Sequence, residues 1–283
     1  MRFLAVFVAL VSMVSVSAAK DESKVTEFVN LHLNSIGTEQ ARAAVKNCVA
    51  QGTVKFQILN RGPQVWEGPA TLVSEGDKLA ALMKFPPTVY RTEWFVRDGQ
   101  RTSVAPVRPG GGPRTGGWSE FGDFIKTHNE ILTEGLWGGT LSTGWALSHL
   151  DERRAKLEDR GVKKVDGIEL HRIDYVPKKS SDLEIQLYFE PDTFRHVMTV
   201  YLMSVAAHLG RTQADSRNEQ ETHYRLEERF GDFKGVDNLT LPERWIIRFT
   251  YGAPSEGLID QYDVTEQKVS HNMSVDPKNF EVK

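Results

Sequence analysis

The chain of 283 residues contains a single cysteine, Cys48. One cysteine cannot form an internal disulfide, and a cysteine-based zinc site would lack its other ligands. Cys48 lies on the apolar stripe of a predicted helix, and no neighbouring feature would activate its thiol. We therefore interpret it as a small buried residue.

The sequence also lacks a strong excess of charge of either sign. It has 35 Lys and Arg residues against 38 Asp and Glu residues, a net charge of −3. Proteins that bind nucleic acids or anionic membrane surfaces usually carry a basic patch or a basic excess. The weakly acidic balance therefore predicts no nucleic-acid partner.

Long hydrophobic runs are absent except at the N-terminus. Arg2 precedes an almost unbroken apolar stretch over residues 3–16, small residues follow, and charged residues begin at Lys20. This order is typical of a cleaved secretory signal peptide, and the run is too short for a membrane span. We predict a signal peptide over residues 1–19, cleaved after Ala18 or Ala19. The mature chain is expected to be secreted and soluble, so its hydrophobic core must stabilise it without disulfides.

Helical periodicity opens the predicted mature chain. Apolar residues recur at helical spacing over residues 24–37, and Gly37 occupies a C-cap position. A second helix is predicted over residues 38–48, with Thr38 as its N-cap. After Gly52 the period of the apolar residues changes to two, which predicts strands.

Strand patterns separated by turn residues fill most of the remaining chain. The predicted strands occupy residues 53–60, two segments within 68–85, two within 88–107, and 168–179, 183–191, 194–205, 222–233, 243–252 and 258–270. Alternation of strands with helices is absent, which excludes a parallel α/β sheet. We predict a mainly β (α+β) fold with about 10–11 antiparallel strands in a large sheet that curls into a barrel.

One insertion, at about residues 107–152, interrupts the strands. A glycine-rich loop over residues 107–117 leads into an amphipathic helix predicted over residues 119–135, with Ser119 as its N-cap. The segment GLWGGTLSTGW follows at residues 135–145, with four glycines, two tryptophans and no charged side chain.

The segment 135–145 matches neither of two well-known glycine-containing motifs. It lacks the lysine of a phosphate-binding loop and the G-x-S-x-G of a nucleophile elbow. Its glycines allow sharp backbone bends, and its Leu and Trp side chains favour burial. Two alternatives remain open: a movable lid over an apolar cavity, or a permanent plug in the core.

Recognisable catalytic or metal-binding groups are missing. The eight histidines have no spacing typical of a metal site. The acidic pairs Asp151-Glu152 and Glu227-Glu228 are interpreted as solvated. We predict no metal, no cofactor and no enzymatic activity; a hydrolase with a dispersed site is the weakest alternative.

Several segments together resemble a known family. The N-terminal helices ending in HLNSIG are followed by CVAQGTVKF, and later by YRTEWFVRDGQR and VDGIELHRIDYVPKKSSDLEIQLYFEPDTFRHV. These segments resemble the opening and the paired strands of bacterial outer-membrane lipoprotein-sorting (LolA/LolB-like) proteins. The resemblance implies an incomplete antiparallel β-barrel that encloses the N-terminal and mid-chain helices. It also implies a lipid, or the acyl chains of a lipoprotein, as ligand. The insertion at about 107–152 has no counterpart in it, and no functional residue can be matched one to one.

We therefore predict a single lipoprotein-sorting-like half-barrel domain over residues 20–283. It would act as a periplasmic binding or carrier protein for a hydrophobic ligand in the bacterial cell envelope. The expected partners are a lipid or an acylated lipoprotein, and an envelope membrane protein. The alternative is a non-catalytic structural or interaction module of the envelope with a filled core.

The period of the apolar residues selects candidate residues for both parts of such a site. The predicted lid residues are Phe121, Phe124, Trp137 and Trp145. The predicted ligand-lining residues of the wall are Trp94, Leu187, Phe189, Met198 and Trp245.

Overall fold

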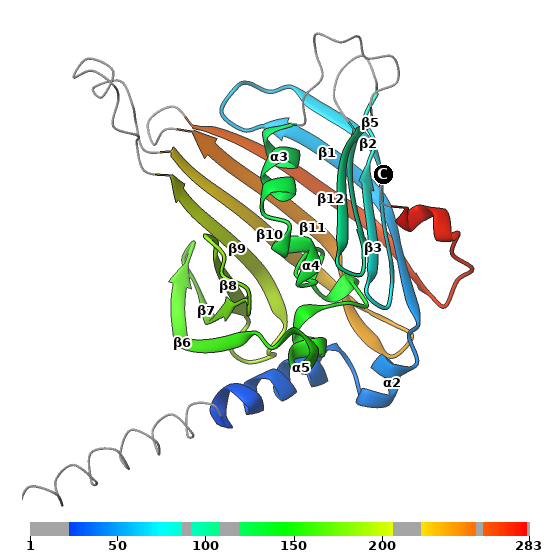
Figure 1. Ribbon diagram of the computed structural model, residues 1–283, viewed down its shortest axis with the longest axis vertical. Helices are drawn as coiled ribbons and strands as arrows, with labels where there is room; N and C mark the ends of the chain where they lie inside the picture. Colours follow the sequence, from blue (N-terminus) through cyan, green and yellow to red (C-terminus); the bar gives the residue numbers. More distant parts are fainter. Residues whose placement is uncertain (1–22, 87–91, 108–118, 206–221, 253–256, 282–283) are drawn as a thin grey trace, which may run out of the picture.

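One antiparallel sheet of twelve strands dominates the computed structural model (Figure 1). The structure describes residues 23–86, 92–107, 119–205, 222–252 and 257–281. The strand order is β5-β4-β3-β2-β1-β12-β11-β10-β9-β8-β7-β6, so β5 and β6 form the two edges and the sheet is not closed. The strands are β1 (Asn47–Ile58), β2 (Val65–Glu75), β3 (Lys78–Met83), β4 (Thr92–Asp98), β5 (Arg101–Val107), β6 (Lys156–Val165), β7 (Ile168–Val176), β8 (Glu184–Phe189), β9 (His196–Val205), β10 (Thr222–Val236), β11 (Leu239–Gly252) and β12 (Leu258–His271). The predicted mainly β fold with an incomplete barrel is confirmed.

The strand that the sequence did not predict is β6. Its sequence KLEDRGVKKV is mostly charged, and none of its residues is buried. An edge strand pairs on one side only, so it needs no apolar alternation, and charges on an edge oppose pairing with other molecules. Its composition is therefore that of a surface segment, although it belongs to the sheet.

The second predicted helix is shorter than expected. α2 spans Glu39–Ala43, and the Thr38 side chain accepts a hydrogen bond from the Ala41 amide, as its predicted N-cap role requires. Cys48 lies in β1, where it is opposite Ser74 of β2 and His271 of β12. The prediction of a helix to residue 48 was wrong because two neighbouring strands pair with this segment, and strand pairing overrides helical spacing. The first helix lies at residues 23–36.

The connection between the two edge strands crosses one face of the sheet. It contains α3 (Glu120–Thr127), α4 (Glu130–Thr133), η1 (Gly139–Leu141), η2 (Ala146–His149) and α5 (Leu150–Arg153). In Figure 1, α3 and α4 lie in front of the sheet, between β2–β5 on one side and β6–β9 on the other. We call the covered face the inner face and residues 119–149 the cover.

The helix predicted over residues 119–135 is in two pieces. Ser119 caps α3 by accepting a hydrogen bond from the Gly122 amide, and the helix ends at His128, which has a non-helical backbone with φ −105° and ψ 61°. The predicted signal peptide and almost all of the glycine-rich loop lie outside the described residues. Among the described residues, no helix has the length and apolar character needed to cross a bilayer.

The outer face of the sheet is covered in part by the end of the chain. Phe280, in η3 (Pro277–Phe280), packs with Val73, Ala80 and Val96 in a second hydrophobic cluster and is 4% exposed. A third cluster on this face lies over β7–β9 and contains Leu170, Tyr188, Met198 and Val200. Both faces of the sheet therefore bury apolar side chains.

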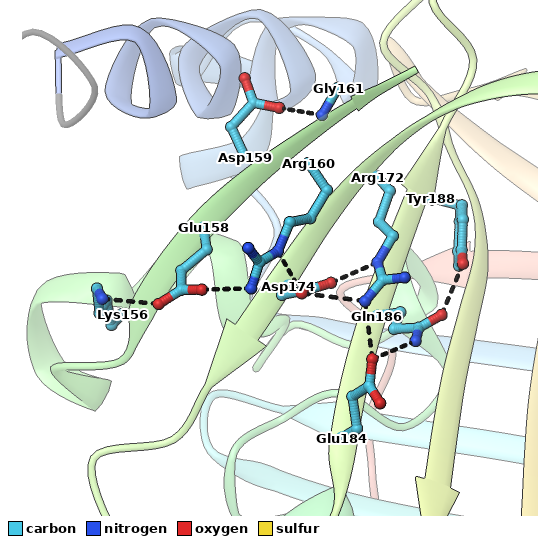
Figure 2. Close-up of polar contacts among 10 residues, drawn as sticks. All are labelled: Lys156, Glu158, Asp159, Arg160, Gly161, Arg172, Asp174, Glu184, Gln186 and Tyr188. Carbon is cyan, nitrogen blue, oxygen red and sulfur yellow. Dashed lines mark hydrogen bonds and ion pairs between the residues drawn. The ribbon is translucent and has the colours of Figure 1, made fainter. Parts of the chain in front are cut away.

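Beside the third cluster, the outer face of β6, β7 and β8 carries a ladder of polar contacts (Figure 2). Asp174 accepts hydrogen bonds from Arg160 Nε at 2.7 Å and from Arg172 Nε at 2.6 Å. Arg172 also reaches Glu184 at 2.7 Å. Partly exposed ion pairs contribute little each, about 0–1 kcal/mol. Together they join three adjacent strands through complementary charges.

The outer cluster around Phe280 gives a direct test of the fold. We expect Phe280→Ala to lower the free energy of unfolding by about 3 kcal/mol, because it leaves a cavity over β2–β4. Met273→Ala is the control, since Met273 is 53% exposed and should change stability by less than about 0.5 kcal/mol. Urea denaturation of the two variants would measure both values, and equal effects would contradict the packing described.

Candidate ligand-binding face

The inner face is strongly aromatic. Phe56, Phe95, Phe249 and Tyr262, on four different strands, are each 0% exposed. They belong to the main hydrophobic cluster, which combines side chains of the sheet, the cover and the first helix. The open sheet therefore presents a continuous apolar surface to whatever lies over it.

The four predicted lid residues all lie on that surface. Phe121, Phe124, Trp137 and Trp145 are between 0% and 4% exposed. Phe121 packs on Phe95, with ring centroids 5.2 Å apart. Trp137 lies 5.1 Å from Trp245 in an edge-on arrangement. The cover thus occupies the position in which an apolar ligand would contact the wall.

The predicted wall residues divide between the two faces. Leu187, Phe189 and Trp245 belong to the main cluster on the inner face. Trp94 and Met198 belong to the two outer clusters and do not line the inner face. Alternation shows which residues of a strand share a face, but apolar side chains cover both faces of β4 and β9. The sequence pattern therefore could not identify the inner side.

The glycines of the segment 135–145 permit close approaches. A Cβ atom on Gly135 would lie 1.9 Å from the Gly144 carbonyl oxygen, and Gly135 has φ +77°. A Cβ atom on Gly144 would lie 2.2 Å from Arg97 Nη2, and one on Gly138 (φ +78°) would lie 2.7 Å from a methyl group of Leu72. The glycine content therefore follows from tight packing of backbone against backbone and against the sheet.

A buried carboxylate binds the cover at its centre. Glu228 on β10 is 0% exposed. Its Oε1 atom accepts hydrogen bonds from the Gly138 amide at 2.8 Å and from Trp245 Nε1 at 3.1 Å. Its Oε2 atom accepts one from the Tyr201 hydroxyl at 2.8 Å. Burial raises the pKa of Glu228 to about 8, although these three hydrogen bonds act in the opposite direction.

The interpretation of Glu227-Glu228 as a solvated pair was wrong. Glu227 is 5% exposed and contacts Arg225 and Arg229 on the outer face, whereas Glu228 points inward. Leu226, Glu228 and Phe230 alternate along one strand, and this spacing placed the carboxylate on the apolar side. That signal was present in the sequence, but the adjacent charges concealed it.

Arg97 binds the cover from the other half of the sheet. It is 1% exposed, and its Nη1 donates to the Leu132 carbonyl at 2.8 Å, near the end of α4. Its Nη2 donates to Asp77 Oδ1 at 3.0 Å. Burial lowers the pKa of Arg97 to about 10, which leaves the guanidinium charged at neutral pH. Nearby, the Thr143 amide donates to Ser74 Oγ at 3.0 Å.

A third contact joins the cover to the first helix. Trp145 Nε1 donates to His32 Nε2 at 3.0 Å, and His32 Nδ1 lies 2.9 Å from the Phe194 carbonyl oxygen. This arrangement requires the neutral imidazole with its proton on Nδ1. Burial lowers the pKa of His32 to about 4, which favours the neutral form. His196, 4.7 Å from the Trp145 ring, packs beside this pair.

A cavity of about 10 Å³ lies at the centre of the inner face, beside Leu72, Met83, Trp245 and Val264. That volume is at the lower limit for one water molecule. An acyl chain could therefore occupy this part of the inner face only if the cover moved. Among the described residues, no group of three or more His, Cys, Asp or Glu side chains could hold a metal ion.

Solved structures of the LolA superfamily are similar to this chain. One, from Nitrosomonas europaea, has 11% sequence identity, covers 90% of this chain and 96% of its own, and gives a TM-score of 0.47. A putative outer membrane lipoprotein-sorting protein domain from Vibrio parahaemolyticus has 10% identity, covers 89% of this chain and 95% of its own, and gives a TM-score of 0.42. A DUF1329 family protein from Desulfovibrio piger has 14% identity, covers 91% and 97% respectively, and gives a TM-score of 0.49.

The resemblance noted in the sequence is therefore found again among solved structures, at low sequence identity. No protein-family model matches the chain, and no curated protein sequence matches it.

The close contact at Gly144 predicts a position-specific effect of a single methyl group. Gly144→Ala should lower the free energy of unfolding by about 2 kcal/mol or more, because Arg97 must shift away from its hydrogen bonds. Gly235→Ala is the matched control, since a Cβ atom there would meet nothing within 4 Å. Thermal unfolding should show a clear loss for the first variant only; a Gly144→Ala protein as stable as the wild type would contradict the close approach.

The buried carboxyl of Glu228 predicts a pH dependence of stability. Its folded pKa, about 8, lies above the ordinary value of 4.5. The folded state therefore holds a proton that the unfolded state has lost, and stability falls as pH rises from about 4.5 to 8. The loss from this group is on the order of 4 kcal/mol.

Glu228→Gln should remove this contribution while retaining the shape of the side chain. The variant should equal or exceed the wild type in stability at pH 9, and the difference between the two should shrink toward pH 5. The quantity to compare is the difference in stability between the two proteins, because His32 contributes equally to both. Its folded pKa is about 4, so below pH 6.5 its contribution makes stability rise with pH, opposite to that of Glu228. A wild-type advantage that grows with pH would contradict the burial of this carboxyl.

Proposed function

We propose that this protein is a non-catalytic carrier that binds a lipid, or the acyl chains of a lipoprotein, on the inner face of its sheet. The cover is the lid: it leaves the inner face when the ligand binds. One observation supports this above all. The apolar inner face belongs to an open sheet, and the segment that covers it is a single connection between the two edge strands. Such a connection can move without breaking a strand pair.

The binding energy of an acyl chain can be compared with the contacts that the lid aromatics would lose. Each buried methylene contributes about 0.8 kcal/mol, so a chain of roughly fourteen carbons offers about 11 kcal/mol before the costs of binding. The four lid aromatics lose a similar apolar contact when they leave, at about 1.5–3 kcal/mol each. An acyl chain can therefore compensate for the loss of these four aromatic contacts. The other buried apolar side chains of the cover, among them Ile131, Leu136 and Leu141, add to the cost of opening.

Three of the polar contacts described above hold the cover at separate places. They are the Gly138 amide on Glu228, the Leu132 carbonyl on Arg97 and the Trp145 indole on His32. Opening exposes all three sheet or helix partners together, which makes opening a concerted step. We further propose that the protein works in the periplasm after removal of residues 1–19, as one domain. An envelope membrane protein would supply or receive its ligand.

A second candidate function is a non-catalytic interaction module of the envelope, with a permanently filled core. The near-complete burial of the four lid aromatics favours it. In that case the cover never leaves the inner face, and partners bind elsewhere.

A reversible cross-link separates the two functions. Ser74 Oγ and the Thr143 amide are 3.0 Å apart, so Ser74→Cys with Thr143→Cys, in a Cys48→Ala background, ties the cover to β2. We expect calorimetric titration with 1-decanol to show binding to the reduced protein. After oxidation, the affinity should be at least about tenfold weaker.

The two single-cysteine variants, oxidised in the same way, are the controls and should bind as the reduced protein does. Binding that survives the cross-link would show that the cover is not the lid. Absence of 1-decanol binding in every form would reject the carrier and favour the interaction module.

A further inference from the structure

One end of the inner face holds a buried carboxylate without a counter-charge. Asp260 on β12 is 5% exposed, and its Oδ1 atom has no hydrogen-bond partner. It forms a side-chain hydrogen bond with Tyr251, which leaves Oδ1 free. No cation among the described residues forms an ion pair with it. Burying an unpaired carboxylate is costly, so this arrangement needs an explanation.

Asp260 faces the inner side of the sheet. Its direct neighbours on the two adjacent strands are Phe249 of β11 and Ile58 of β1. Phe249 is fully buried in the main cluster, and Tyr262, two residues further along β12, belongs to the same cluster. The carboxylate is therefore part of the surface that the cover occupies.

A second carboxylate reaches this place from the cover. Glu120, in the first turn of α3, acts on both Asp260 and Tyr251 through its negative charge. Burial, with Glu120 as a further cause, raises the pKa of Asp260 to about 6. Arg61 is close enough to act on the hydroxyl of Tyr251, but it does not act on Asp260. Two like charges therefore act on the same place, and no ion pair of Asp260 among the described residues offsets them.

Aromatic rings surround the same position. The rings of Phe249 and Tyr251 are stacked, with centroids 5.1 Å apart and planes 20° apart. Phe121 of the cover lies 5.8 Å from Phe249. The faces of aromatic rings attract organic cations, and a carboxylate beside them adds a charge-assisted contact. Carboxylate and aromatic rings together are suited to an ammonium group.

We infer that Asp260, with Glu120 and the ring of Tyr251, forms a binding position for an ammonium group of the ligand. This inference rests on the proposed carrier function and specifies its ligand. The ligand is an amphiphile whose chain lies along the inner face and whose cationic head lies at the β11–β12 end. Phe121 lies between this position and the rest of the wall, so head and chain are bound by adjacent parts of the cover and the sheet.

A series of amphiphiles with the same chain tests the inference. The probes are decylammonium, 1-decanol and decanoate, titrated by calorimetry below their aggregation concentrations at pH 7.5, where Asp260 is ionised. The wild type should bind decylammonium at least about tenfold more tightly than 1-decanol, and decanoate more weakly than either. Asp260→Asn should abolish the preference for decylammonium and leave the affinity for 1-decanol unchanged.

Two further variants complete the test: a matched control and a second change at the proposed position. Asp263→Asn is the matched control on the same strand, because Asp263 faces the outer side and pairs with Arg244 at 2.7 Å; it should preserve the preference. Glu120→Gln, at an exposed position of α3, should reduce the preference without affecting the fold. Glu120→Gln therefore still tests the ammonium position if Asp260→Asn folds poorly.

The outcomes distinguish this inference from the function on which it rests. Equal affinity of the wild type for decylammonium and 1-decanol, or an unchanged preference in both Asp260→Asn and Glu120→Gln, would overturn the ammonium position and leave the carrier intact. If none of the three probes binds, the carrier function itself is rejected, and the ammonium position with it.

Discussion

Covering two apolar faces of an open sheet is the constraint on which the rest of this structure depends. In a closed barrel, one face of the sheet surrounds a single apolar interior. This sheet of twelve strands has two free edges and buries apolar side chains on both of its faces. The end of the chain covers part of the outer face through Phe280. The inner face is covered by the connection from β5 to β6, whose aromatic rings and glycines are explained by that position.

Two buried carboxyl groups beneath the cover, Glu228 and Asp260, differ in how completely their oxygens are hydrogen-bonded. Glu228 receives three hydrogen bonds and has a complete set of partners when the cover is in place. Asp260 has a free oxygen and a second carboxylate nearby. The hydrogen-bonding oxygens of Glu228 are therefore satisfied in the covered state, whereas one oxygen of Asp260 is not. This contrast shows that the inner face is more than an apolar surface.

Much of the fold could be predicted from the sequence, because most strands show either alternation or turn residues at their ends. The buried aromatic residues of the cover could be selected by helical spacing and by the apolar character of residues 135–145; their role as a lid stays a prediction. The parts that could not be predicted depend on partners distant in sequence. Cys48 belongs to a strand because Ser74 and His271 lie beside it, and β6 is a strand because β7 pairs with it.

Trp94 and Met198 were assigned to the wall because alternation cannot distinguish two faces that are both buried. Glu228 and Asp260 gave no motif, since a single carboxylate in a strand becomes significant only when its surroundings are known.

The pairing of β1 with β12 has a consequence for the order in which the chain can fold. Strands β1–β5 and β6–β12 are each built from neighbours in sequence, but within the sheet the two groups join only through the pairing of β1 with β12, from Cys48 opposite His271 to Ile58 opposite Asp260. Such a pairing closes a loop of nearly the whole chain, and distant contacts of this kind slow folding. The sheet therefore cannot be completed until its last strand has been synthesised, and until then the first group presents β1 as an unpaired edge. This topology delays the native state until the C-terminal strand is available.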